Sequence, residues 1–228
     1  MRPLVRFRAA LVVAALAVGS SAVLADPGAP VAASCPKSPG VRYFPEATFV
    51  PFVEEWYSKK LVAMGEPSLS CGVLEDAETY RFLWIPAFLD SVAVRVFRRG
   101  DDYGLEAVIL GPGHYVPGAD RYDLPSLDRY YPGDVSRRVT RALSRDEWQT
   151  VIARLDEIQF WQMRPTGCYF VPCDLRGGNS DADGARWIVE ARRNGRYHIV
   201  DRLYGPDSTL RSVGRLFTNL ANLKVGGL

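Results

Sequence analysis

The chain has 228 residues, with 28 basic and 26 acidic side chains, 47% hydrophobic residues, two histidines and four cysteines. This length and apolar content suit one domain with a substantial core. The near balance of charge excludes a strongly basic surface for nucleic acid, and two histidines exclude a histidine-rich metal site. No cofactor is predicted, because phosphate-loop, dinucleotide and serine-nucleophile motifs are absent from the sequence.

Residues 1–25 resemble a secretory signal peptide, with three arginines, an apolar run and small residues up to Ala25. Three of the basic residues and none of the acidic ones lie in this segment, so cleavage after Ala25 would leave a net charge of −1. Residues 26–40 are rich in Pro, Ala and Ser and predict a disordered tail, and residues 41–228 predict a single domain. We therefore expect a periplasmic or secreted protein without an integral membrane span in its mature form. The open alternative is a lipid anchor on Cys35, which follows a loose lipobox.

Four cysteines in an exported chain predict disulfides. Three pairings are possible, and we favour Cys168–Cys173 with Cys35–Cys71. The first closes a short loop worth about 2 kcal/mol, and the second closes a longer loop worth about 4 kcal/mol. A zinc site is the alternative, but the spacing lacks the paired C-x₂-C pattern.

The N-terminal half predicts one helix and three strands. A helical stripe of apolar residues covers 46–64, with Pro51 suited to its first turn and Gly65 to its end. Strands are expected at 80–88, 92–98 and 103–110. A long irregular segment follows at 111–135, which could carry function or simply cover the core.

The C-terminal half predicts a strand at 137–143, two helices and a hairpin. Ser144 and Glu147 form a capping box that starts the first of these helices, and the second covers 207–221. Asn194-Gly195 lies between two strand-like runs, the strongest short-range signal of a β-hairpin. The order of elements predicts an α+β fold, an antiparallel sheet of a meander plus the C-terminal hairpin, with helices packed on one face.

The register of the hairpin follows from its two-residue turn. Side chains alternate between faces, so Trp187, His198 and Arg202 share one face and form a candidate pocket. Glu190 points to the opposite face, which excludes an acid–base pair between His198 and Glu190 within the hairpin. Aromatic residues at such spacing are more often core than ligand cage.

One motif matches the spacing of a calcium loop. Its oxygen ligands would be Asn179, Asp181, Asp183 and Glu190, with Gly184 at the turn position. The two helices that normally aim such a loop are not predicted here, because a strand follows it. We expect a polar turn entering the hairpin, with no calcium bound at functional affinity.

Several segments resemble a family of uncharacterised exported bacterial proteins, periplasmic or lipoprotein-like. The segments that carry the likeness are Glu55-Trp56-Tyr57-Ser58, Gly65-Glu66-Pro67-Ser68-Leu69, Tyr80-Arg81-Phe82-Leu83-Trp84, Phe160-Trp161-Gln162-Met163, 183–190 and 195–202. The family has no assigned activity, so the resemblance implies an intact exported domain and supplies no catalytic residues. The segment 167–181, cysteines included, is longer than the family's usual connection.

Two functions suit these features. The first is a non-enzymatic binding module, of inhibitor or immunity type, whose partner is a protein or a small ligand in the periplasm. The alternative is a small periplasmic hydrolase with a carboxylate or His198 site. Absent catalytic motifs favour the first.

Overall fold

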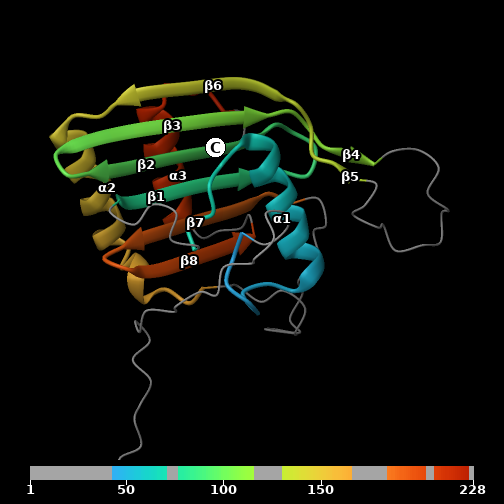
Figure 1. The fold of residues 1–228 in the computed structure, drawn as a ribbon, viewed down its shortest axis with the longest axis horizontal. Helices are drawn as coiled ribbons and strands as arrows, with labels where there is room; N and C mark the ends of the chain where they lie inside the picture. Colours follow the sequence, from blue (N-terminus) through green and yellow to red (C-terminus); the bar gives the residue numbers. More distant parts are fainter. Residues whose placement is uncertain (1–42, 71–76, 116–129, 166–183, 204–207, 226–228) are drawn as a thin grey trace, which may run out of the picture.

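The computed structural model describes residues 43–70, 77–115, 130–165, 184–203 and 208–225. The predicted order of elements is confirmed (Figure 1). The helices are α1 (Pro51–Met64), α2 (Arg145–Glu157), α3 (Ser208–Leu220) and a short 3₁₀ turn, η2 (Phe160–Gln162). The strands are β1 (Ala77–Ile85), β2 (Ser91–Arg99), β3 (Asp102–Leu110), β4 (His114–Tyr115), β5 (Tyr130–Tyr131), β6 (Val135–Ala142), β7 (Arg186–Arg193) and β8 (Arg196–Leu203).

Six of the strands form one sheet in the order β6-β3-β2-β1-β7-β8, and every neighbouring pair is antiparallel. The meander β1-β2-β3 and the hairpin β7-β8 therefore join side by side, through the pairing of β1 with β7. The α+β class and the antiparallel sheet are confirmed. Strands β4 and β5 pair separately, inside the segment predicted to be irregular.

The hairpin has the predicted register. Arg193 lies opposite Arg196, and Trp187 lies opposite Arg202. Asn194 and Gly195 form the turn with φ angles of 50° and 74°. These positive values are those of a type I′ turn, which Asn and Gly adopt at low cost.

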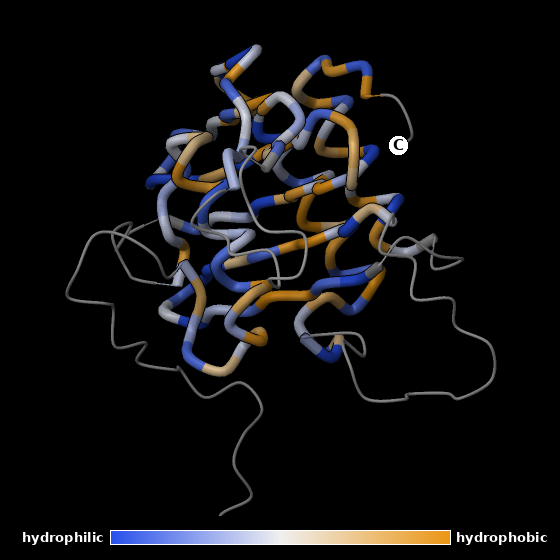
Figure 2. Tube along the Cα trace, turned by 90° about the vertical axis from the view of Figure 1, so that its right-hand side faces the viewer, coloured by the Kyte–Doolittle hydropathy of each residue, from blue (hydrophilic) through white to orange (hydrophobic). Residues whose placement is uncertain are grey.

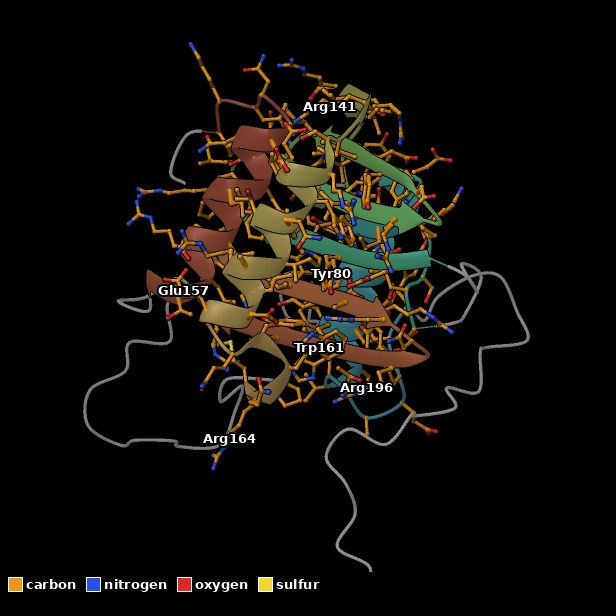
Figure 3. All side chains as sticks on the ribbon, turned by 90° about the vertical axis from the view of Figure 1, so that its left-hand side faces the viewer. Tyr80, Arg141, Glu157, Trp161, Arg164 and Arg196 are labelled. Atoms are coloured by element: carbon orange, nitrogen blue, oxygen red, sulfur yellow. The ribbon has the colours of Figure 1, made fainter. Side chains whose placement is uncertain are left out.

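The placement of the helices on one face is wrong. Helices α2 and α3 pack on one face of the sheet, but α1 covers the opposite face, so the molecule has three layers (Figure 3). The cause lies in the strands, which are apolar on both faces: Phe82 faces the α2–α3 layer, whereas the adjacent Leu83 faces α1. A sheet with two apolar faces needs cover on both.

The helix ends follow local chemistry. Pro51 opens α1, and Gly65 ends it in the left-handed conformation with φ of 68°. At the start of α2, Ser144 and Glu147 form the reciprocal capping box, as predicted. Helix α3 approaches the sheet so closely that a Cβ on Gly214 would lie 2.5 Å from the ring of Phe82.

Strand β1 ends earlier than predicted. It stops at Ile85 because Pro86 has no N–H to donate to the ladder. Phe88, which we expected inside the strand, lies in the β1–β2 turn with 74% of its surface exposed. Its neighbour Leu89 is 55% exposed. Figure 2 views the sheet from the end where β1 turns into β2.

Candidate functional site

The three side chains of the candidate pocket share one face, as the register predicts, but belong to the packing of the α2–α3 layer. Trp187 is only 4% exposed and lies against Phe82, with ring centroids 5.7 Å apart. Its ring also lines the contact with Gly214 of α3. Trp187 is therefore a core residue at the centre of this layer.

His198 lies within a stack of rings. The ring of Phe160 meets it edge-on at 4.9 Å, and the ring of Trp161 lies 5.8 Å away. Arg196 also contacts Trp161, with its guanidinium 5.3 Å from the centre of the ring, and Figure 3 shows these two side chains together. The stack closes the lower end of the α2–α3 layer.

The electrostatics of His198 favour its neutral form. Burial lowers its pKa and outweighs the backbone carbonyls of Phe160 and Met163, which act in the opposite direction. Its Nε2 atom is buried without a hydrogen-bond partner. In the described part of the chain, no carboxylate makes an ion pair with His198, so the acid that would orient a catalytic imidazole is not beside it.

Arg202 holds the chain that follows η2. Its guanidinium donates to the backbone carbonyl of Arg164 at 2.8 Å. The backbone N–H of Asp201, the residue before Arg202, donates to the carbonyl of Pro165, the residue after Arg164, at 2.7 Å. This short segment therefore lies along β8 and covers part of that edge of the sheet.

Only one of the calcium-like ligands lies in a described segment. Asn179, Asp181 and Asp183 fall outside the described residues, as do all four cysteines of the predicted disulfides. Glu190 is fully buried on β7, where Arg81 donates to one of its carboxylate oxygens. The hydroxyl of Tyr197 donates to the other oxygen at 2.7 Å. Both oxygens thus have protein donors within the sheet.

Glu190 belongs to a row of charges across the α1 face. Glu106, Arg95, Arg81 and Glu190 are successive partners on β3, β2, β1 and β7. Glu66, from the turn after α1, reaches between the two arginines. Its Oε2 atom lies 3.0 Å from Nε of Arg95 and 3.4 Å from Nη1 of Arg81.

This charge row is closed rather than open to a ligand. Arg81, Glu66 and Glu190 have fully buried side chains, and Arg95 is 6% exposed. Burial alone would lower the pKa of Arg81, but the charges of Glu190 and Glu66 outweigh it and raise that pKa. Ions buried in this way need internal partners. The row fixes the turn after α1 on the sheet.

A second buried cluster ties the middle of α1 to the hairpin. The hydroxyl of Tyr57 donates to Asp201 at 3.2 Å and accepts from Nε of Arg186 at 3.0 Å. Arg186 also donates to Asp201 through Nη2 at 3.0 Å. Burial, and then the charge of Asp201, raise the pKa of Tyr57 well above its usual value, so the phenol stays protonated.

Lys60 is the buried amine of this face. It is 2% exposed, and its Nζ donates to the hydroxyl of Ser91 at 3.0 Å. Burial lowers its pKa to about 8. No ion pair of Lys60 occurs within the described ranges. A lysine whose pKa is lowered in this way has a nucleophilic amine at mildly alkaline pH. The amine of Lys60, however, is buried between α1 and the sheet.

Sequence reasoning missed both charge clusters, although a signal was present. Each of three strands carries one charged residue within an apolar run: Arg81 in β1, Arg95 in β2 and Glu190 in β7. A lone charge at the centre of a buried strand requires a partner of opposite sign on a neighbouring strand. The register needed to pair them was not available from the sequence.

A groove of about 290 Å³ lies elsewhere, on the α2–α3 side of the sheet at the end where β1 turns into β2. Its walls combine apolar side chains with one exposed acid and one exposed base. They are Trp84, Phe88, Leu89, Asp90, Val92, Ile109, Lys224 and Val225. None of the three predicted pocket residues lines it.

Comparisons with protein-family models, with curated proteins and with solved structures gave no match. The resemblance to exported bacterial proteins therefore stays a prediction. Within the described ranges, no helix has the length and apolar character needed to cross a membrane. The same ranges contain no group of three or more His, Cys, Asp or Glu side chains arranged to hold a metal ion.

Proposed function

We propose that this chain is an exported, non-enzymatic binding module that docks a protein partner, as an inhibitor or immunity-type protein does. The observation that carries the proposal is the apolar tip of the β1–β2 turn beside the groove. Phe88 and Leu89 are 74% and 55% exposed there, although burying each would be worth about 1.5–3 kcal/mol. Large apolar side chains gathered in one exposed place mark interaction surfaces.

The groove suits one inserted side chain of a protein partner. Its volume of about 290 Å³ lies at the lower limit of pockets for small ligands, roughly 300–1,000 Å³. It is large enough for an apolar side chain inserted by a partner. The exposed charges of Asp90 and Lys224 at its margin supply the polar rim that such interfaces have.

The buried charges support the same interpretation. Glu190, Glu66 and Asp201 are used by internal donors, which leaves little of their chemistry for a substrate. One observation favours the alternative, a small hydrolase: Nε2 of His198 is buried without a partner and could accept a proton. In that case His198→Ala should keep the fold and abolish turnover.

The test uses two residues of nearly equal exposure on different surfaces. Leu89 is 55% exposed at the groove, and Val62 is 52% exposed on α1. A photo-crosslinking amino acid at Leu89 should give a discrete adduct in cell-envelope extract, and the same group at Val62 should not. Mass spectrometry then identifies the partner, which is purified for binding measurements.

With the purified partner, Leu89→Asp should weaken binding at least tenfold, because a charge would be placed in the apolar contact. Val62→Asp is the control and should change the affinity less than twofold. Both variants should melt within a few degrees of the wild type, since exposed substitutions have small effects on stability. A partner that binds Leu89→Asp as tightly as the wild type would disprove docking at this groove.

A further inference from the structure

Strand β6 is an open edge of the six-stranded sheet. It has eight residues and pairs with β3 along one side (Figure 1). Six of its residues are exposed. The opposite edge, β8, is partly covered, because Asp201 donates its backbone N–H to Pro165. Among the described strands, β6 is thus the long edge available for further pairing.

The direction of the free backbone groups follows from one hydrogen bond. Leu143, just after β6, donates its N–H to Tyr103, which lies opposite it on β3, at 2.9 Å. Directly opposite residues of an antiparallel pair alternate between bonded and non-bonded. Counting back from Leu143 in steps of two, the backbone N–H groups of Arg141 and Val139 point toward β3. The N–H groups of Arg138, Thr140 and Ala142 consequently point away from the sheet.

The side chains along this edge are basic. Residues 134–142 contain three arginines and one aspartate. Arg141 is paired with Glu147 at 2.7 Å. Arg138 donates to the carbonyl of Met64 at 2.7 Å and makes no ion pair within the described residues. Arg137 is exposed and makes no ion pair within the described residues.

These charges decide which strand could pair here. Two copies of the chain that met edge to edge at β6 would bring arginines close together, and like charges on paired strands are unfavourable. An extended segment with acidic residues would instead place carboxylates beside Arg137 and Arg138. The edge therefore opposes self-pairing and favours an acidic strand.

We propose that β6 is a docking site for an extended, acidic segment of a partner protein, which adds to the sheet as a seventh strand. Its affinity would come from main-chain hydrogen bonds to Arg138, Thr140 and Ala142. Its specificity would come from carboxylates facing the edge arginines. The main-chain donors of this site do not line the groove at the β1–β2 turn, although Arg137 pairs with Ile109, which does.

The test uses the full chain and two synthetic ten-residue peptides. One repeats two glutamates followed by two valines, so that each face of the extended peptide carries carboxylates, and the other has lysine in place of each glutamate. The glutamate peptide should bind in a fluorescence-anisotropy titration and slow amide hydrogen exchange at Arg138, Thr140 and Ala142. The lysine peptide should bind at least tenfold more weakly.

Thr140→Pro removes an outward N–H while sparing the ladder to β3, a position where an edge strand tolerates proline. It should weaken binding of the glutamate peptide at least tenfold, whereas Thr140→Val should change it less than twofold. If Thr140→Pro does not fold, Arg137→Glu replaces it and should weaken the glutamate peptide to a similar degree. Leu89→Asp, at the groove, should leave peptide affinity unchanged.

Three results would overturn the proposal. The first is absence of binding by the glutamate peptide, and the second is equal binding of the two peptides. The third is a concentration-dependent dimer of the free protein that Thr140→Pro dissociates, which would assign the edge to a second copy of the chain.

Discussion

Replacing Glu190 by Gln should destabilise the protein more than the same change at any carboxylate on the surface. The variant keeps the size of the side chain and removes its charge. Arg81 is fully buried and donates to Glu190 through two nitrogens. In the variant, Arg81 would keep Glu66 as a carboxylate partner, with Oε2 of Glu66 3.4 Å from Nη1 of Arg81.

The magnitude follows from the balance of the buried charges. In the wild type, two buried arginines face two buried carboxylates, with Glu106 of the same row 32% exposed. Glu190→Gln would leave Arg81 with one carboxylate, Glu66, which lies 3.4 Å away and is shared with Arg95. Removing one partner of a buried ion pair costs about 3–5 kcal/mol. For a chain of this size that lowers the melting temperature by about 6–20 °C.

Reversible urea unfolding at pH 7 measures the effect. The matched control is Glu147→Gln, because the ion pair of Glu147 with Arg141 lies at the surface, with both side chains about a third exposed. It should cost less than about 1 kcal/mol. The double variant Arg81→Met with Glu190→Leu should be more stable than Glu190→Gln, since it removes the buried arginine together with its nearest carboxylate. Equal, small losses for Glu190→Gln and Glu147→Gln would refute burial as the reason.

Three further predictions rest on single residues. Burial lowers the pKa of Lys60 to about 8 in the folded protein, against its usual 10.5, so the unfolded chain binds more protons between these two pH values. The free energy of unfolding should therefore rise by about 3 kcal/mol from pH 8 to 10.5. Urea titrations at several pH values measure this rise, and Lys60→Met should abolish it. Trp187→Ala should cost about 3–5 kcal/mol in the same assay by opening a cavity beside Phe82, and a loss below about 1 kcal/mol would contradict its core placement. Ser144→Ala should cost about 1 kcal/mol by removing the cap of α2, and Ser144→Asp, which can still accept the same hydrogen bond, should recover most of it.

Local chemistry made much of the fold predictable. The hairpin register depends on the two residues Asn194 and Gly195, and the start of α2 depends on Ser144 and Glu147. Each signal acts within a few residues, so a single sequence contains it in full. The strand ends were less certain, because Pro86 stops β1 three residues before the apolar run ends.

The prediction of helices on one face failed because the strands are apolar on both faces. Adjacent residues Phe82, Leu83 and Trp84 are all apolar and buried, so β1 has no polar face to turn toward solvent. The helix 46–64 was predicted, but nothing local states on which side of the sheet it lies. That choice depends on which face the other helices leave bare, a property of the whole chain.

The groove and the charge row could not be predicted from residue types alone. His198 and Trp187 were predicted to form a pocket because their side chains suit ligand binding. In the structure His198 packs against the ring of Phe160, and Trp187 is a buried core residue. Phe88 was predicted to end a strand, and only the turn after Pro86 exposes it together with Leu89.

In the function that we propose, partner recognition depends on residues whose types are ordinary and whose exposure is unusual. A buried side chain has already gained the free energy of leaving water, so it contributes little further to binding, whereas Phe88 and Leu89 have most of that free energy still to gain. The same argument applies to the backbone of β6: its outward N–H groups have no strand partner among the described residues, and a partner strand would supply acceptors in register. The central charge row holds the turn after α1 on the sheet. A variant of the row should consequently change stability and leave the affinity of the folded protein for both partners unchanged.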